Sequence, residues 1–278
     1  MEVVFKIHRF DPSKDVSPYY KQYKITIDKG TTVLEALLYI KERLDNSLAI
    51  RYSCRMGICG SCGMRINGIP MLACKTQVSM LKSNIILIEP LSNNPIIKDL
   101  VTNFSNLFAK HKMIKPYIIR KDSELDNPTR EYLQKPNEFF NILQFALCIK
   151  CGLCWSACPI SSDNRYLGPF VLAQAYRYIS DSRDDGYNER FDIIDSPHGC
   201  WRCHFAGSCS QVCPRGVDPA LAIQLLKKSI TTTKLGLKKI KTAAPVAPPL
   251  TEVTRKLDVP QPPPRTVFKN QRDSTNER

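Results

Sequence analysis

Residues 148–159 read CIKCGLCWSACP, a run in which four cysteines and one proline recur at fixed intervals. The spacing C-x2-C-x2-C-x3-C-P is typical of iron–sulfur ligation in which three cysteines bind one cluster and the fourth binds a second cluster. The run therefore predicts a partner run elsewhere in the chain. That partner is found downstream, at Cys203, Cys209, Cys213 and Pro214. Ala206 occupies the position where the partner run would place its second cysteine.

Exchanging the fourth cysteines between the two runs assigns two sets of ligands. The first set has four thiolates and predicts a [4Fe–4S] cluster at Cys148, Cys151, Cys154 and Cys213. The second set has three thiolates and predicts a [3Fe–4S] cluster at Cys158, Cys203 and Cys209. Three thiolates leave one corner iron without a protein ligand, so that corner is easily lost.

A third group of cysteines lies upstream and has a different spacing. Cys54, Cys59, Cys62 and Cys74 follow the pattern C-x4-C-x2-C…C, which predicts a plant-type [2Fe–2S] cluster. Gly57, Gly60 and Gly63 stand beside these ligands. Glycine permits unusual backbone angles, so amide N–H groups can approach the sulfurs closely and stabilise a reduced cluster.

Disulfides and zinc are the alternatives to iron for these cysteines. Cysteines two or three residues apart are poorly placed to bridge one another, and the chain shows no secretory signal. Zinc knuckles also use C-x2-C pairs. A formal charge of +14 would suit binding to nucleic acid, to anionic lipid or to an acidic partner protein. Zinc sites use two pairs of cysteines, whereas here three cysteines at two-residue intervals precede a fourth cysteine and a proline. This pattern favours iron–sulfur clusters over zinc.

The N-terminal part, residues 1–105, predicts a β-grasp domain. Residues 3–10, 23–27 and 85–88 have the pattern of strands, and Asn67-Gly68 marks a hairpin turn. Thr32 and Glu35 form a capping box that opens a helix running to about residue 44.

Residues 106–230 predict a helical domain that contains both C-terminal cysteine runs. Residues 167–181 and 219–228 have helical periodicity, and residues 143–147 should pack just ahead of the first ligand. Residues 231–278 are basic and proline-rich, which predicts a disordered tail. The expected fold class is therefore α+β. No run of eighteen apolar residues is present, so no membrane span is expected.

The chain resembles the iron–sulfur subunit of succinate dehydrogenase and fumarate reductase. The resemblance extends from residue 1 to about residue 230. It rests on five strings: RYSCRMGICGSCGMRING (51–68), PLSNNPIIKDLV (90–101), CIKCGLCWSACP (148–159), YLGPFVLAQAYRYISDSRD (166–184) and WRCHFAGSCSQVCPRGVDP (201–219). It implies a plant-type [2Fe–2S] ferredoxin domain followed by a bacterial two-cluster ferredoxin domain.

The resemblance also implies a function. Succinate would be oxidised at FAD in a separate flavoprotein, and electrons would pass through [2Fe–2S], [4Fe–4S] and [3Fe–4S] to quinone at a membrane-anchor subunit. Fumarate reduction is the reverse direction. The expected partners are that flavoprotein, the anchor and quinone, without nucleic acid, and no residue here need be a catalytic acid, base or nucleophile. Because no targeting segment precedes the first strand, we expect a prokaryotic protein on the cytoplasmic face of the membrane, held there by its partners.

The sequence departs from the family near the expected quinone site. Pro159 and His204 match positions next to the quinone, but the tryptophan that many members carry after the residue matching Cys158 is missing. Trp201 either replaces that ring or packs in the core. Cys200 is an additional cysteine, either a spare buried thiol or an alternative fourth ligand.

Two other classes of protein share these features. A free-standing multicluster ferredoxin would contain the same clusters without a flavoprotein partner. A zinc-bearing nucleic-acid-binding protein would share the cysteines and the charge. Iron and sulfide in the purified protein would exclude the second class, and co-purification with a succinate-oxidising flavoprotein would exclude the first.

Overall fold

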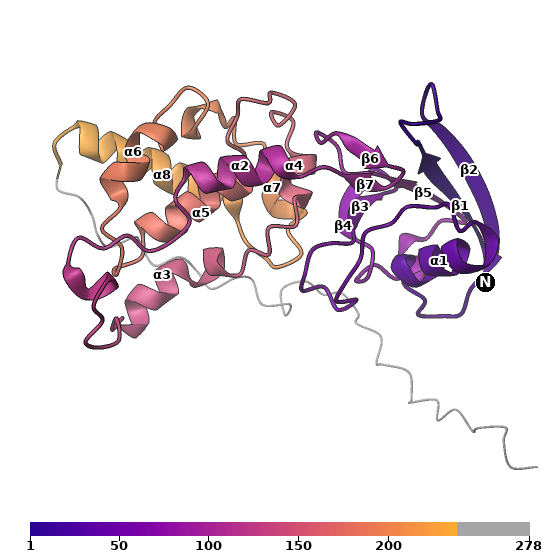
Figure 1. Ribbon diagram of the computed structural model, residues 1–278, viewed down its shortest axis with the longest axis horizontal. Coiled ribbons are helices and arrows are strands. Elements are labelled where there is room, and N and C mark those ends of the chain that lie inside the picture. The colour runs from indigo at the N-terminus through magenta and orange to yellow at the C-terminus, as the bar shows by residue number, and fades with distance from the viewer. Residues whose placement is uncertain (238–278) are drawn as a thin grey trace, which may run out of the picture.

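The computed structural model describes residues 1–237, which form a sheet-containing half and a helical half (Figure 1). This arrangement confirms the α+β class. Of the predicted tail, residues 238–278 lie outside the described residues. The prediction of disorder is wrong for residues 231–234, because the last helix, α8, runs from Pro219 to Lys234.

The N-terminal half is a five-stranded sheet in the order β2-β1-β5-β3-β4. Its strands are β1 (Glu2–Arg9), β2 (Tyr19–Thr26), β3 (Gly63–Ile66), β4 (Ile69–Leu72) and β5 (Ile85–Glu89). Strand β1 lies between β2 and β5, antiparallel to β2 and parallel to β5. Asn67 and Gly68, at φ values of 48° and 82°, turn β3 into β4, as the sequence predicts.

One helix, α1 (Val33–Tyr39), packs on this sheet and continues as a wider turn, η1 (Ile40–Leu44). The predicted capping box is confirmed, because Thr32 Oγ1 accepts a hydrogen bond from the Glu35 amide at 3.2 Å and the Glu35 carboxylate accepts one from the Thr32 amide at 2.7 Å. The apolar face of α1 lies in the core of this half, at Val33, Leu34, Ala36, Leu37 and Leu38.

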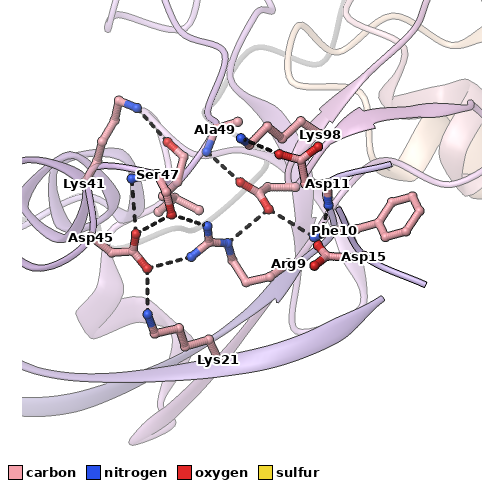
Figure 2. A network of polar contacts seen from close by, with 12 residues as sticks. Arg9, Phe10, Asp11, Asp15, Lys21, Lys41, Asp45, Ser47, Ala49 and Lys98 are labelled. Atoms are coloured by element: carbon pink, nitrogen blue, oxygen red, sulfur yellow. Dashed lines mark hydrogen bonds and ion pairs between the residues drawn. The ribbon is translucent and has the colours of Figure 1, made fainter. Parts of the chain in front are cut away.

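A buried arginine fastens the end of β1 to two distant segments (Figure 2). Arg9 donates to Asp45 at 2.7 Å, just after η1, and to Asp99 at 3.0 Å, in the short hairpin of β6 (Ile96–Lys98) and β7 (Val101–Thr102). Asp99 also accepts from the amide of Ala49 at 2.8 Å. These contacts join the end of β1 to residues 45–49, the segment that leads into the first cysteine loop.

The helical half is built around α5 and α8, which pack against each other. The helices of this half are α2 (Ser105–Met113), α3 (Pro136–Ala146), α4 (Leu153–Ala157), α5 (Pro169–Ile179), α6 (Tyr187–Ile194), α7 (Ser208–Gln211) and α8. Short 3-10 turns complete the described elements: η2 (Val78–Leu81) in the sheet half, then η3 (Ser123–Leu125) and η4 (Cys200–Arg202). Pro136, Pro169 and Pro219 each occupy the first turn of a helix, where the missing N–H has no intrahelical partner to lose.

The two halves meet where α4 begins. The Trp155 indole donates to the carbonyl of Asn93 at 2.9 Å, and the amide of Ser92 donates to the Ser156 hydroxyl at 2.9 Å. Leu153 belongs to the apolar core of the sheet domain, although it lies in the helical half of the sequence. The first C-terminal cysteine loop is therefore held directly against the sheet domain.

Candidate iron–sulfur cluster sites

The upstream cysteine loop surrounds its sulfurs with backbone amides. Cys54 Sγ accepts from the amides of Met56, Ile58 and Cys59 at 3.4, 3.3 and 3.2 Å. Cys59 Sγ accepts from the amides of Cys54 and Ser61, and Cys74 Sγ accepts from that of Gly57 at 3.2 Å. Positive φ angles at Arg55, Gly57 and Gly60 (58°, 74° and 75°) bend the loop in this way. Such N–H···S bonds favour the more negative, reduced form of a cluster.

The thiols of this loop differ in acidity. Burial opposes ionisation of Cys59, but hydrogen bonds from Cys54 and Ser61 lower its pKa to about 6. Burial raises the pKa of Cys62 to about 12. A thiol of low pKa is a ready ligand for iron at neutral pH, because the thiolate is the form that binds metal.

The four cysteines predicted to bind [4Fe–4S] come together in the helical half. They line one pocket, whose cysteine lining consists of Cys148, Cys151, Cys154 and Cys213. Burial raises the pKa of Cys154 well above its usual value, and the neighbouring Cys151, Cys148 and Cys213 raise it further. Buried thiols become thiolates only when cations offset the charge, which iron would do.

The three cysteines predicted to bind [3Fe–4S] line a second cavity. These are Cys158, Cys203 and Cys209, and Ala206 also lines this cavity. Burial raises the pKa of Cys209 to about 11, and Cys158 and Cys203 add to that shift. Pro159 and His204, the predicted quinone-adjacent residues, also line this cavity.

The two cysteine loops of the helical half have the same backbone course. In the first loop Lys150 (φ 54°) and Gly152 (φ 77°) are left-handed and enclose Cys151 before α4 begins. In the second loop Phe205 (φ 59°) and Gly207 (φ 75°) are left-handed and enclose Ala206 before α7 begins. Ala206 thus stands in the second loop where Cys151 stands in the first.

Cys200 and Trp201 do not line either cavity. Cys200 is fully buried, and burial raises the pKa of its thiol to about 12. Its position favours the reading as a spare thiol over that of a fourth ligand. Trp201 is 45% exposed and donates to Asp195 at 2.7 Å, so the interpretation of Trp201 as a core residue is wrong.

Two of the three sites approach each other at a glycine. A Cβ atom placed on Gly60 would lie 2.6 Å from Cys151 Cβ and 2.9 Å from its Cα. Gly60 lies between two upstream ligands, and Cys151 is a predicted [4Fe–4S] ligand. The cysteine spacing places Gly60 beside sulfur but gives no sign of this contact, because no local pattern relates two segments so far apart in the sequence.

The set of donors fits iron–sulfur clusters better than the alternatives. All twelve cysteines lie within the described residues, and each is a free thiol there. Within residues 1–237, no three side chains of His, Cys, Asp or Glu converge closely enough to hold a single metal ion. Sets of three and four thiols that line a shared cavity suit a multi-atom iron–sulfur cluster.

The fold and these sites define an iron–sulfur protein that joins two ferredoxin-type modules. Residues 4–109 match the family model of a 2Fe-2S iron-sulfur cluster binding domain, and residues 144–217 match that of a 4Fe-4S dicluster domain. These matches support [2Fe–2S] and [4Fe–4S] clusters. No helix in the described part of the chain is long and apolar enough to cross a membrane.

Individual relatives identify the family. The fumarate reductase iron-sulfur subunit of Mycobacterium tuberculosis is 42% identical over 239 residues, covering 86% of this chain and 96% of the relative. Those of Haemophilus influenzae and Escherichia coli are 42% and 43% identical, covering 78% and 79% of this chain and 89% of each relative. The chain therefore belongs to the family of succinate dehydrogenase and fumarate reductase iron–sulfur subunits, which confirms the resemblance. A chain of the Mycobacterium smegmatis Sdh1 complex shares the fold, with a TM-score of 0.75 at 23% identity, covering 84% of this chain and 97% of that one.

Proposed function

We propose that this chain is the electron-transfer subunit of a succinate:quinone oxidoreductase, relaying electrons between a FAD-containing flavoprotein and quinone. Its cysteines hold three clusters: [2Fe–2S] at Cys54, Cys59, Cys62 and Cys74, [4Fe–4S] at Cys148, Cys151, Cys154 and Cys213, and [3Fe–4S] at Cys158, Cys203 and Cys209. When bound, these clusters supply one-electron redox chemistry between a two-electron flavin and a quinone. The proposed role is respiratory and belongs to the tricarboxylic acid cycle.

The observation that carries this proposal is the order of the three sites. Gly60 brings the upstream loop against Cys151 of the four-cysteine cavity. Helices α4 and α7, which each begin within a cysteine loop, pack against each other and join the two C-terminal cavities. The ligand sets therefore form a continuous series from the sheet domain to the cavity that Ala206 lines.

Exposed apolar side chains mark both ends of this series. Met56 and Ile58, beside the upstream ligands, are 71% and 50% exposed, which suits docking of the flavoprotein. Phe205 is 59% exposed beside the three-cysteine cavity, next to His204. We assign that end to the membrane-anchor subunit and the quinone, with Pro159, His204 and Trp201 as the nearby residues. The chain would thus be a peripheral protein on the cytoplasmic face, held through its partners.

Fumarate reduction is the second candidate for the direction of the reaction. The curated relatives named above are iron–sulfur subunits of fumarate reductase, which favours it. Nothing in the cysteine sites fixes the direction, because the same ligands carry electrons either way.

Purification of the native complex through a tag on this chain tests the proposal. We expect iron, sulfide and FAD in the complex, and succinate-dependent reduction of quinone that exceeds quinol-dependent reduction of fumarate. The opposite ratio would establish the second candidate. A brown protein that purifies alone would indicate a free-standing ferredoxin, and zinc in place of iron would contradict both.

The quinone end is tested within the same complex. His204→Ala should slow quinone reduction by succinate while leaving unchanged the reduction of a soluble dye that accepts electrons at the flavin. The dye assay is the internal control for assembly. An unchanged quinone rate would remove His204 from the quinone site.

A further inference from the structure

Lys110 is a buried cation without a side-chain anion beside it. It lies on α2 and is only 6% exposed. Its ammonium donates to the backbone carbonyl of Tyr166 at 2.7 Å and lies 4.3 Å from the centroid of the Trp155 ring. None of the ion pairs among residues 1–237 includes Lys110.

Such an arrangement is costly unless a further negative charge offsets it. One carbonyl and one aromatic ring replace only part of the hydration that an ammonium loses on burial. Burial accordingly lowers the pKa of Lys110, and only the more distant Asp163 opposes this. Asp163 is itself paired with Arg165 and Arg202, each at 3.3 Å.

The two residues that Lys110 contacts lie next to the two C-terminal sites. Trp155 directly follows Cys154, which lines the four-cysteine cavity. Tyr166 is buried and lines the three-cysteine cavity. The ammonium thus contacts one residue that lines the three-cysteine cavity and one that follows a cysteine of the four-cysteine cavity, in the part of the protein where thiolate-bound clusters would place negative charge.

We propose that Lys110 is a positioning residue for electron transfer, whose buried ammonium raises the reduction potentials of the clusters in the two C-terminal cavities. This inference rests on the proposed function, because it requires clusters in both cavities. Reduction of a cluster adds one electron, and a nearby cation stabilises the added negative charge. Inside a protein the interaction is stronger than in water, because the local dielectric is low. Charge close to a cluster is one of the means by which proteins set its potential.

The test compares neutral and charged replacements in the purified complex. Lys110→Met removes the charge and preserves much of the side-chain length, and Lys110→Gln removes the charge but can still donate to the Tyr166 carbonyl. Lys112→Met is the matched control, because Lys112 is exposed two residues further along the same helix. Lys110→Arg retains the charge. Potentials are measured by EPR-monitored redox titration of each cluster.

We expect Lys110→Met and Lys110→Gln to lower the potentials of the two C-terminal clusters, with a smaller shift at [2Fe–2S]. Lys112→Met should leave all three potentials unchanged, and Lys110→Arg should stay close to the wild type. Unchanged potentials in whichever of Lys110→Met and Lys110→Gln assembles would overturn the proposal. Equal shifts in Lys110→Arg and Lys110→Gln would also overturn it, because they would indicate a structural role. A wild type without C-terminal cluster signals would contradict the proposed function instead.

Discussion

The two cavities of the helical half have the same construction and differ at one corner. Cys151 supplies the second thiol of the four-cysteine cavity, whereas Ala206 holds the equivalent place in the three-cysteine cavity. The Cys151 corner is covered, because Gly60 of the sheet domain lies directly against it. The Ala206 corner is exposed, and so are His204 and Phe205 beside it. The fourth thiol is thus present at the covered corner and absent at the open one.

This difference has an electrostatic consequence. A site with three thiolates carries less negative ligand charge than a site with four, so reduction at the three-thiolate site is favoured. The difference would give the higher potential to the site at the open, apolar end of the chain, where the proposed quinone partner binds.

The largest effect is expected from removing Cys213, the thiol that the exchange of fourth cysteines assigns to the four-cysteine cavity. Cys213→Ala should abolish the [4Fe–4S] signal and destabilise the helical half, because binding of metal centres is coupled to folding. EPR spectroscopy and iron analysis would show the loss. Cys213 lies in the second cysteine run, beside the predicted [3Fe–4S] ligands. Loss of the [3Fe–4S] signal alone in Cys213→Ala would therefore contradict the assignment of Cys213 to the four-cysteine cavity.

A smaller effect is expected from disturbing the contact between Gly60 of the sheet domain and Cys151. Gly60→Ala and Gly57→Ala place a side chain at nearly the same φ, 75° and 74°, so each should cost about 1–2 kcal/mol of backbone strain. A methyl group at position 57 would meet the aliphatic part of the Lys75 side chain, whereas a methyl group at position 60 would meet Cβ and Cα of Cys151. Gly60→Ala should therefore slow electron transfer from [2Fe–2S] to [4Fe–4S], and Gly57→Ala should not.

Time-resolved EPR after rapid reduction measures this transfer. The midpoint of thermal unfolding, compared between the two variants, separates strain from the loss of contact. Equal transfer rates in Gly60→Ala and Gly57→Ala would mean that the Gly60 contact is only structural.

The smallest effect on the clusters is expected at Cys200. Because Cys200 does not line the three-cysteine cavity, Cys200→Ser should leave the EPR spectrum unchanged. It should cost about 1–3 kcal/mol of unfolding free energy, since a buried hydroxyl replaces a thiol. A change in the [3Fe–4S] signal would make Cys200 a ligand and remove the proposed difference between the cavities.

The sequence predicts those features that local spacing determines. The cysteine runs, the capping box at Thr32 and the hairpin turn at Asn67 are encoded within a few residues, and the structure contains all three elements. Strand β2 begins at Tyr19, four residues before the predicted start at residue 23. The sequence does not predict these four residues as strand, because all four are exposed and lack the alternation that marks a half-buried strand.

Features that depend on tertiary contacts are missed. Helix α6 is weakly patterned and is held by Arg190, a fully buried arginine paired with Asp184 at 2.7 Å. A charged side chain in such a position gives no sequence signal of burial. The contact of Gly60 with Cys151 and the burial of Lys110 are of the same kind, since both depend on segments that lie far apart in the sequence.

The EPR spectrum of the oxidised complex, recorded for the wild type and for Ala206→Cys, tests the central claim most directly. The wild type should show the signal of an oxidised [3Fe–4S] cluster. Ala206→Cys supplies a thiol where Cys151 stands in the other cavity, so it should diminish that signal, favour a [4Fe–4S] cluster and lower the potential at that site. An oxidised protein that is fully loaded with iron yet EPR-silent in both forms would contradict the three-thiolate account.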